Sequence, residues 1–205
     1  MKVALFHNGT YASNCYLVTD NAESGAILID PSVSPAFVER TVFPLPKIDA
    51  ILLTHGHFDH MLELDAWRRR TGAPVLIAVE DAPALGSPEL SCYRSFLGEN
   101  KTHAPADRLL AAGDTVDVGG ERLTVIAVPG HTPGSLAFDS GELLFTGDTM
   151  FAGGGYGRFD LPGGNGDLLV LSLGELLMLE GERRLLAGHG EEGLLSAEKK
   201  HYNFS

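Results

Sequence analysis

The sequence predicts an α/β or α+β sheet protein, and three observations support that prediction. Short apolar runs rich in β-forming residues recur along the chain and are bounded by turn residues. Segments with the helical spacing of apolar residues lie between some of these runs. The chain has 205 residues, which is enough to bury one sizeable core, so we expect a single domain over residues 1–205. Strands and helices mixed in this way build layered sheet folds.

The first part of the chain alternates strands with short helices. The expected strands are residues 2–6, 15–18, 26–29, 51–53 and 74–79. A short helix is expected over residues 35–40, with Ser34 as its N-terminal cap. A longer helix is expected over residues 61–70, because Met61, Leu64 and Trp67 share one face and Gly72 ends the pattern.

The second part begins with an irregular segment. Residues 80–105 are rich in Pro, Ser and Gly, and we expect a loop with short helical turns on the substrate side. Strands are expected again at residues 109, 115–118, 122–128, 135–138 and 143–145. A helix over about residues 167–179 and a strand over residues 184–187 are the last elements expected.

Composition excludes several classes of function. The net charge is −12, whereas nucleic-acid binders rely on basic patches. The arginines at 68–70 are therefore interpreted as a solvated helix face, and the acidic balance suits a protein that holds divalent cations. No apolar run is long enough to span a membrane and no signal peptide is evident, so a cytoplasmic location is expected. Cys15 and Cys92 predict no disulfide, and Cys15 is interpreted as an inert core thiol.

Histidines are concentrated in one short segment. Three of the eight histidines, His55, His57 and His60, follow the apolar strand over residues 51–53, and Asp59 lies among them. Neutral imidazoles and a carboxylate are ligands that suit zinc and related metals. His55 and His57 can point the same way from extended backbone, and Asp59 and His60 are expected at a helix N-terminus. The cluster predicts a metal site, with surface polarity as the alternative interpretation of this segment alone.

Three more apolar strands lead to a possible ligand. His131 follows the run at 125–130, Asp148 the run at 143–147, and His189 the run at 185–188. Each run ends in glycine, which lets the backbone turn tightly beside an ion. Without a common site, four such strand ends would have to arise by coincidence, so the pattern favours one metal centre.

The whole pattern resembles the metallo-β-lactamase superfamily, whose hallmark is a His-x-His-x-Asp-His run followed by a distant His, Asp and His. The resemblance implies a four-layer αβ/βα sandwich with the metals at one edge of the two sheets. It implies a first metal site formed by His55, His57 and His131. It implies a second metal site formed by Asp59, His60 and His189, with Asp148 as a bridge between the two metals. Seven ligands exceed the needs of one tetrahedral ion, and two-metal hydrolytic sites hold their ions about 3.5–4 Å apart. The expected ions are divalent, with zinc first and iron or manganese as alternatives.

Four further runs, residues 54–60, 129–134, 147–151 and 157–164, resemble glyoxalase II-like members, the hydroxyacylglutathione hydrolases that split glutathione thioesters. The chain ends soon after His189, so it resembles the short, single-domain members without the C-terminal helical region that supplies much of the glutathione site. This implies a hydrolase of glutathione thioesters or other thiol thioesters. Arg158 is a candidate contact for a substrate carboxylate, and an ion pair with Asp160 or a neighbour is the alternative.

The mechanism that we expect uses a hydroxide that bridges the metals and attacks an ester or thioester carbonyl, because metals lower the pKa of bound water toward about 7. Asp59 is expected both to ligate a metal and to orient the hydroxide. The sequence offers no Gly-x-Ser-x-Gly nucleophile motif. Ligand histidines need an outer acceptor on their second nitrogen, and Asp30 is the candidate, with a plain turn aspartate before Pro31 as the alternative.

Other functions stay open at the level of sequence. A persulfide dioxygenase on the same fold would bind one iron through His55, His131 and Asp148. A lactonase or phosphodiesterase on the same site is a further alternative, because fold does not determine substrate. A metal-binding module without turnover is the non-enzymatic alternative. Each enzymatic alternative implies a small-molecule partner, and neither a nucleic acid nor a membrane.

Overall fold

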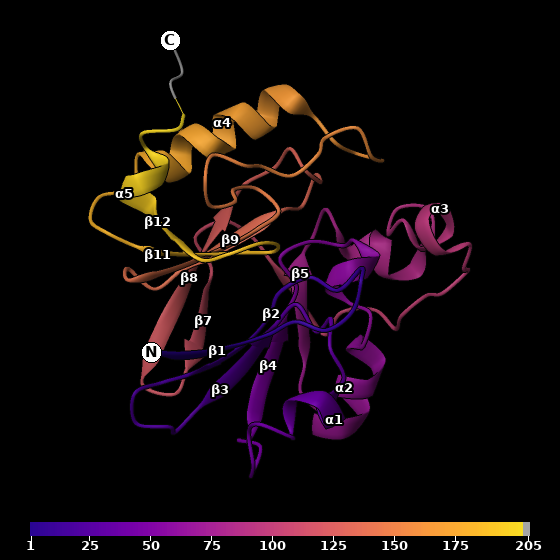
Figure 1. Ribbon diagram of the computed structural model, residues 1–205. Coiled ribbons are helices and arrows are strands. Elements are labelled where there is room, and N and C mark those ends of the chain that lie inside the picture. Colours follow the sequence, from indigo (N-terminus) through magenta and orange to yellow (C-terminus); the bar gives the residue numbers. More distant parts are fainter. Residues whose placement is uncertain (203–205) are drawn as a thin grey trace.

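The computed structural model describes residues 1–202 of the chain. Two six-stranded sheets pack face to face, and helices cover their outer faces (Figure 1). The first sheet has the order β1-β2-β3-β4-β5-β6, from β1 (Lys2–Phe6), β2 (Cys15–Thr19), β3 (Ala26–Ile29), β4 (Ile48–Leu52), β5 (Val75–Ala78) and β6 (Arg108–Leu110). The second has the order β12-β11-β10-β9-β8-β7, from β7 (Thr115–Val118), β8 (Glu121–Ala127), β9 (Leu136–Asp139), β10 (Leu143–Gly147), β11 (Arg184–Ala187) and β12 (Gly193–Leu194).

The helices divide between the two sheets. In Figure 1, α1 and α2 lie against the purple half of the molecule, whereas α4 and α5 lie against the orange and yellow half. The helices are α1 (Pro35–Val38), α2 (Leu64–Thr71), α3 (Tyr93–Leu97), α4 (Gly166–Leu177) and α5 (Leu195–Glu198), with 3-10 turns η1 (Phe58–His60) and η2 (Ala82–Gly86). Ser34 caps α1 as predicted, since its hydroxyl accepts a hydrogen bond from the backbone N–H of Phe37.

Burial follows the strand pattern. Strands β3 and β5, which both pair in parallel with β4, are buried at every position, as expected for strands covered on both faces. Strand β7 instead alternates, with Val116 and Val118 buried and Thr115 and Asp117 exposed, because only one of its faces meets the core.

Apolar side chains form three layers. One layer lies between the sheets and includes Ile27, Leu52, Phe138 and Phe145. A second joins the first sheet to α1 and α2, and a third joins the second sheet to α4 and α5. These layers confirm the predicted four-layer αβ/βα sandwich.

Two expectations about local structure were wrong. The helix expected over residues 61–70 begins at Leu64, because Asp59 and His60 lie in the separate turn η1 and the N–H of Glu63 donates to the carbonyl of Pro31. Met61 is nevertheless fully buried, which explains why the apolar spacing extended beyond the helix. The short elements β12 and α5 after β11 were not expected. Among residues 1–202, no helix has the length and apolar character needed to cross a bilayer.

Candidate metal centre

Strand ends at one edge of the sandwich deliver all seven predicted ligands to a single place. His55 and His57 follow β4, and η1 then carries Asp59 and His60. The other three ligands follow strands of the second sheet and are His131 after β8, Asp148 after β10 and His189 after β11. Strands β10 and β11 are parallel, so their carboxyl ends reach the same edge. The structure therefore brings together side chains that are up to 134 positions apart, the difference between His55 and His189.

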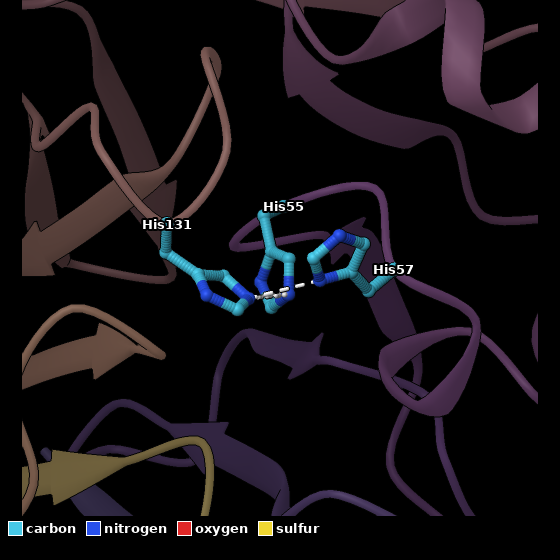
Figure 2. A group of neighbouring side chains, drawn as sticks. All are labelled: His55, His57 and His131. Atoms are coloured by element: carbon cyan, nitrogen blue, oxygen red, sulfur yellow. Dashed lines mark hydrogen bonds between the residues drawn. The ribbon is translucent and has the colours of Figure 1, made fainter. Parts of the chain in front are cut away.

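Three histidine nitrogens meet in the first group. Figure 2 shows His55, His57 and His131 with their rings turned toward one point. The Nε2 atom of His131 lies 2.9 Å from His57 Nδ1 and 3.2 Å from His55 Nε2. A tetrahedral ion with bonds of about 2.0–2.1 Å would place its nitrogen ligands about 3.3 Å apart, so the three nitrogens are spaced as ligands of one ion would be.

A second group forms around His60. Its Nε2 atom lies 3.8 Å from Asp59 Oδ2, and His189 Nε2 lies 3.1 Å from that same oxygen. Asp148 lies between the two groups, with Oδ1 3.2 Å from His60 Nε2 and Oδ2 3.6 Å from His131 Nε2. Asp148 therefore faces both groups, which is the position that the resemblance implies for a bridging residue.

Close approach of the backbone makes this arrangement possible at Gly188. A Cβ atom at that position would lie 2.2 Å from Asp148 Oδ1 and 2.7 Å from His60 Cε1. Any larger residue would displace both side chains. The glycine before His189 therefore serves the geometry of the cluster as well as the turn.

The chemistry of the cluster fits divalent cations. His60 Nε2 and Asp148 Oδ1 are buried without a hydrogen-bond partner within the described chain, and such atoms are costly unless something else binds them. Burial, with help from neighbouring histidines, holds the pKa of His55 well below its usual range and lowers the pKa of His57 to about 3. Neutral imidazoles offer the lone pairs that a metal requires.

Negative charge surrounds the second group. Burial disfavours the charged form of His60, yet the carboxylates of Asp148, Asp30 and Asp59 raise its pKa well above the usual range. Burial acts to raise the pKa of Asp148, but His60 and the other histidines lower it below the ordinary value of a carboxyl group. A positive charge is thus favoured between ionised carboxylates, and a divalent cation would supply it.

Asp30 lies where the sequence analysis places an outer acceptor. Its Oδ2 atom is 2.8 Å from His60 Nδ1 and accepts a hydrogen bond of 2.7 Å from the Thr54 hydroxyl. Thr54 Oγ1 is in turn 3.1 Å from His55 Nδ1. One carboxylate therefore orients a histidine of each group, directly for His60 and through Thr54 for His55.

Arg158 contributes through its backbone. Its carbonyl oxygen accepts a 2.6 Å hydrogen bond from His131 Nδ1, which leaves His131 Nε2 free to bind an ion. Its guanidinium forms a two-pronged ion pair with Asp160, at 2.6 and 2.7 Å. The ion pair is therefore the interaction present, and contact with a substrate carboxylate stays a prediction.

Asp81 is an important residue that the sequence analysis missed. Its buried carboxylate accepts hydrogen bonds from Gly56 N at 2.8 Å, Thr132 Oγ1 at 2.7 Å and Gly134 N at 2.7 Å. Burial raises its pKa, and these three hydrogen bonds oppose that shift. Gly56 lies between His55 and His57, and Thr132 follows the third histidine of the group, so one side chain joins the ligand loops of both sheets.

A signal for Asp81 was present in the sequence. It lies three residues after β5, which runs parallel to β4, so it reaches the same edge as the histidines. At Gly134, a Cβ atom would lie 2.7 Å from Asp81 Oδ1, and glycine is thus required for the close contact.

An open pocket of about 330 Å³ adjoins the cluster. Ligand candidates form its floor, namely His57, Asp59, His131, Asp148 and His189. Its other lining residues are Thr10, Tyr11, Phe58, Cys92, Phe96, Phe151, Gly157, Arg158 and Leu161. Cys92 and Phe96 come from the irregular segment at 80–105, which was expected on the substrate side. A small molecule in this pocket would have direct access to any ion held by the cluster.

Comparisons with known proteins agree with this geometry. The profile of the family described as the metallo-beta-lactamase superfamily matches residues 8–189. The hydroxyacylglutathione hydrolase GloC of Haemophilus influenzae is 30% identical over 213 residues, covering 100% of this chain and 98% of that protein. The structure of the BLEG-1 B3 metallo-beta-lactamase superposes with a TM-score of 0.90 at 30% identity, covering 98% of this chain and 97% of the other. TTHA1623, solved in a di-iron-bound form, gives a TM-score of 0.84 at 33% identity, covering 99% and 100%.

Proposed function

Because the chain belongs to the metallo-β-lactamase superfamily, we propose that it is a binuclear metallohydrolase that cleaves thioesters. One observation carries the proposal: Asp148 lies between two groups of ligand-type side chains and lines an open pocket beside them, with one oxygen near His60 and the other near His131. In this proposal, the first ion would be held by His55, His57 and His131. The second would be held by Asp59, His60 and His189, and Asp148 would be shared.

The ions would be divalent, with zinc as the first candidate and iron or manganese as alternatives. When bound, such ions polarise a carbonyl oxygen and lower the pKa of water. The chain itself supplies position and charge. Asp59 lines the pocket with a side chain that is 18% exposed, and His60 and His189 lower its pKa against the opposing effect of burial. Its ionised carboxylate can therefore accept a hydrogen bond from an attacking water molecule and orient it.

The nature of the leaving group follows from the same charges. Asp59 and Asp148 are the carboxyl groups among the described residues that line the pocket, and neighbouring histidines lower the pKa of both, so neither carboxyl group is favoured as a proton donor to a leaving group. A thiol has a pKa near 8.5 and departs as a thiolate without prior protonation, whereas an alkoxide does not. This supports thioesters over ordinary esters. The similarity to GloC, named as a hydroxyacylglutathione hydrolase, supports the same class.

The test combines metal analysis with turnover. Protein purified without added metal is analysed for its metal content and assayed with S-lactoylglutathione. We expect two divalent ions per chain and hydrolysis at neutral pH. Asp148→Ala should lose at least one ion and lower kcat by at least about 100-fold, because it removes the residue shared by both groups. Asp117→Ala, a change at an exposed aspartate on β7, is the matched control and should alter neither value.

Several results would overturn the proposal. Full metal content and full rate in Asp148→Ala would contradict the bridging role. One iron per chain with oxygen uptake on glutathione persulfide would identify a dioxygenase instead. Bound metal without turnover on thioester, lactone, phosphodiester and β-lactam substrates would indicate a metal-binding module.

A further inference from the structure

We propose that the pocket beside the metal centre selects an uncharged, aromatic-sized apolar substrate group, so that neutral thioesters are better substrates than glutathione conjugates. This inference rests on the proposed thioesterase function and names its substrate class. Two independent features of the pocket lead to it, namely an aromatic wall and a single arginine, already paired with an aspartate, as the one lysine or arginine among the described residues that line it.

The wall consists of three aromatic side chains in contact. The rings of Phe58 and Phe96 are stacked, with centroids 5.4 Å apart and planes at 26°. The ring of Tyr11 lies beside that of Phe58, with the two centroids 6.1 Å apart. Tyr11 and Phe96 are 50% and 40% exposed, although aromatic side chains of this size gain most from burial. An apolar surface left open beside a candidate reactive centre is what an apolar ligand would cover.

One residue of the aromatic wall is a chain neighbour of two candidate ligands. Phe58 lies between His57 and Asp59 in the chain and forms the first residue of η1. Tyr11 comes from the loop between β1 and β2, and Phe96 comes from α3, so two separate segments of the chain pack onto this one ring. Tyr11 and Phe96 line the same pocket as His57, Asp59 and His189, so a ligand in this pocket can contact both the wall and the candidate metal centre.

The charges of the pocket disfavour glutathione. Its tripeptide carries two carboxylates, and a buried or half-buried carboxylate needs a cationic partner. Arg158 is the one lysine or arginine among the described residues that line the pocket, and its Nε and Nη2 atoms already donate to the carboxylate of Asp160. The remaining charged side chains in the lining are the carboxylates of Asp59 and Asp148 and the histidines that would bind metal. The two carboxylates of glutathione would have to share this one guanidinium with Asp160, whereas a neutral group needs no cation.

The experiment uses the metal-loaded protein and substrates that differ in one feature at a time. The phenylacetyl thioesters of N-acetylcysteamine and of glutathione share an acyl group and differ in thiol charge. The phenylacetyl and acetyl thioesters of N-acetylcysteamine share a thiol and differ in aromatic area. We expect kcat/KM to be at least about tenfold higher for the neutral phenylacetyl thioester in each comparison, as the loss of a paired charge or a ring contact is of that order.

Variants then assign the effect to the wall. Phe96→Ala should raise KM for the neutral phenylacetyl thioester about threefold to tenfold, since an aromatic contact contributes on that scale. The same variant should change KM for the acetyl thioester less, and kcat should change little. Leu171→Ala removes an apolar side chain that is 63% exposed on α4, outside the pocket lining, and should leave both substrates unaffected.

A binding measurement separates this inference from the proposed function. Calorimetry compares S-benzylglutathione with the benzyl thioether of N-acetylcysteamine, neither of which can be hydrolysed. Tighter binding of the neutral compound, weakened by Phe96→Ala, supports the inference even if no thioester is turned over. A preference for the glutathione compounds in rate or binding, or an equal response of both acyl groups to Phe96→Ala, would overturn it and leave thioesterase activity standing.

Discussion

Asp81 should prove essential to the candidate metal centre although it is not among the predicted ligands. Asp81→Ala removes the acceptor of three hydrogen bonds, from Gly56 N, Thr132 Oγ1 and Gly134 N. The Thr132 hydroxyl keeps Ser135 Oγ at 2.7 Å, so two buried backbone N–H groups lose their partner. Each unsatisfied buried donor costs about 1–3 kcal/mol, which amounts to about 2–6 kcal/mol for the pair.

Part of this cost is offset. The raised pKa of Asp81 means that burying its charge is itself unfavourable, and that penalty disappears in the alanine variant. We therefore expect a net loss of about 2–4 kcal/mol in the free energy of unfolding, from the lower part of the range above. For a chain of this length, the loss corresponds to a Tm lower by roughly 4–16 °C. Loosening of both loops should also weaken binding at the first group by about 10–100-fold, as for other residues that orient ligands.

Two assays test these values. Thermal unfolding of the metal-free protein, followed by circular dichroism, gives the change in Tm. Competition with a chromophoric chelator gives metal affinity, and Asp117→Ala is the control for loss of an aspartate from the surface. A Tm that changes by less than about 1 °C would refute the predicted loss of two hydrogen bonds. Lower stability with unchanged metal affinity would refute the coupling of Asp81 to the ligand loops.

Three further results are expected. Asp30→Asn should lower metal affinity about 10–100-fold in chelator competition, because it replaces the carboxylate that contacts His60 Nδ1; unchanged affinity would exclude that orienting role. Phe138→Ala should lower the free energy of unfolding by about 3–5 kcal/mol in urea titrations, since this ring is fully buried between the sheets; a loss below about 1 kcal/mol would contradict the packing described. Burial raises the pKa of Cys15 to about 12, so its reactive thiolate is scarce at pH 8, and mass spectrometry should detect alkylation by iodoacetamide only after denaturation. Rapid labelling of Cys15 in the native protein would show that it is more accessible than the structure indicates.

Apolar periodicity predicted an element well where the order of buried and exposed residues along the chain reflects its surroundings directly. Strand β7 alternates between buried and exposed residues, and β3 is apolar throughout. In each strand, the order of residue types shows whether one face or both faces are buried. The same signal misled at Met61, which is buried beside α2 but lies before its first turn. Apolar spacing reports which side chains face the core, and it does not report whether the backbone between them keeps helical hydrogen bonds.

Contacts between distant loops could not be predicted in this way. Arg158 was expected to use its guanidinium, yet it reaches His131 through its carbonyl oxygen. The partners of Asp81 are the N–H groups of Gly56 and Gly134, and no side-chain pattern marks a backbone donor. The aromatic wall likewise depends on Tyr11 and Phe96 meeting at Phe58, although they are far apart in sequence.

The amino-acid sequence was enough to predict most strands, the longer helices and the identity of the side chains that collect at one edge. It could do so because the candidate ligands lie shortly after β4, β8, β10 and β11, and the parallel strands β10 and β11 end at the same edge. The folded structure was needed to learn which nitrogen of each histidine faces the centre, which carboxylates orient the ligands and which residues form the pocket. These contacts depend on the angles at which loops from the two sheets pack against each other. Such loops meet only after the two sheets have packed together.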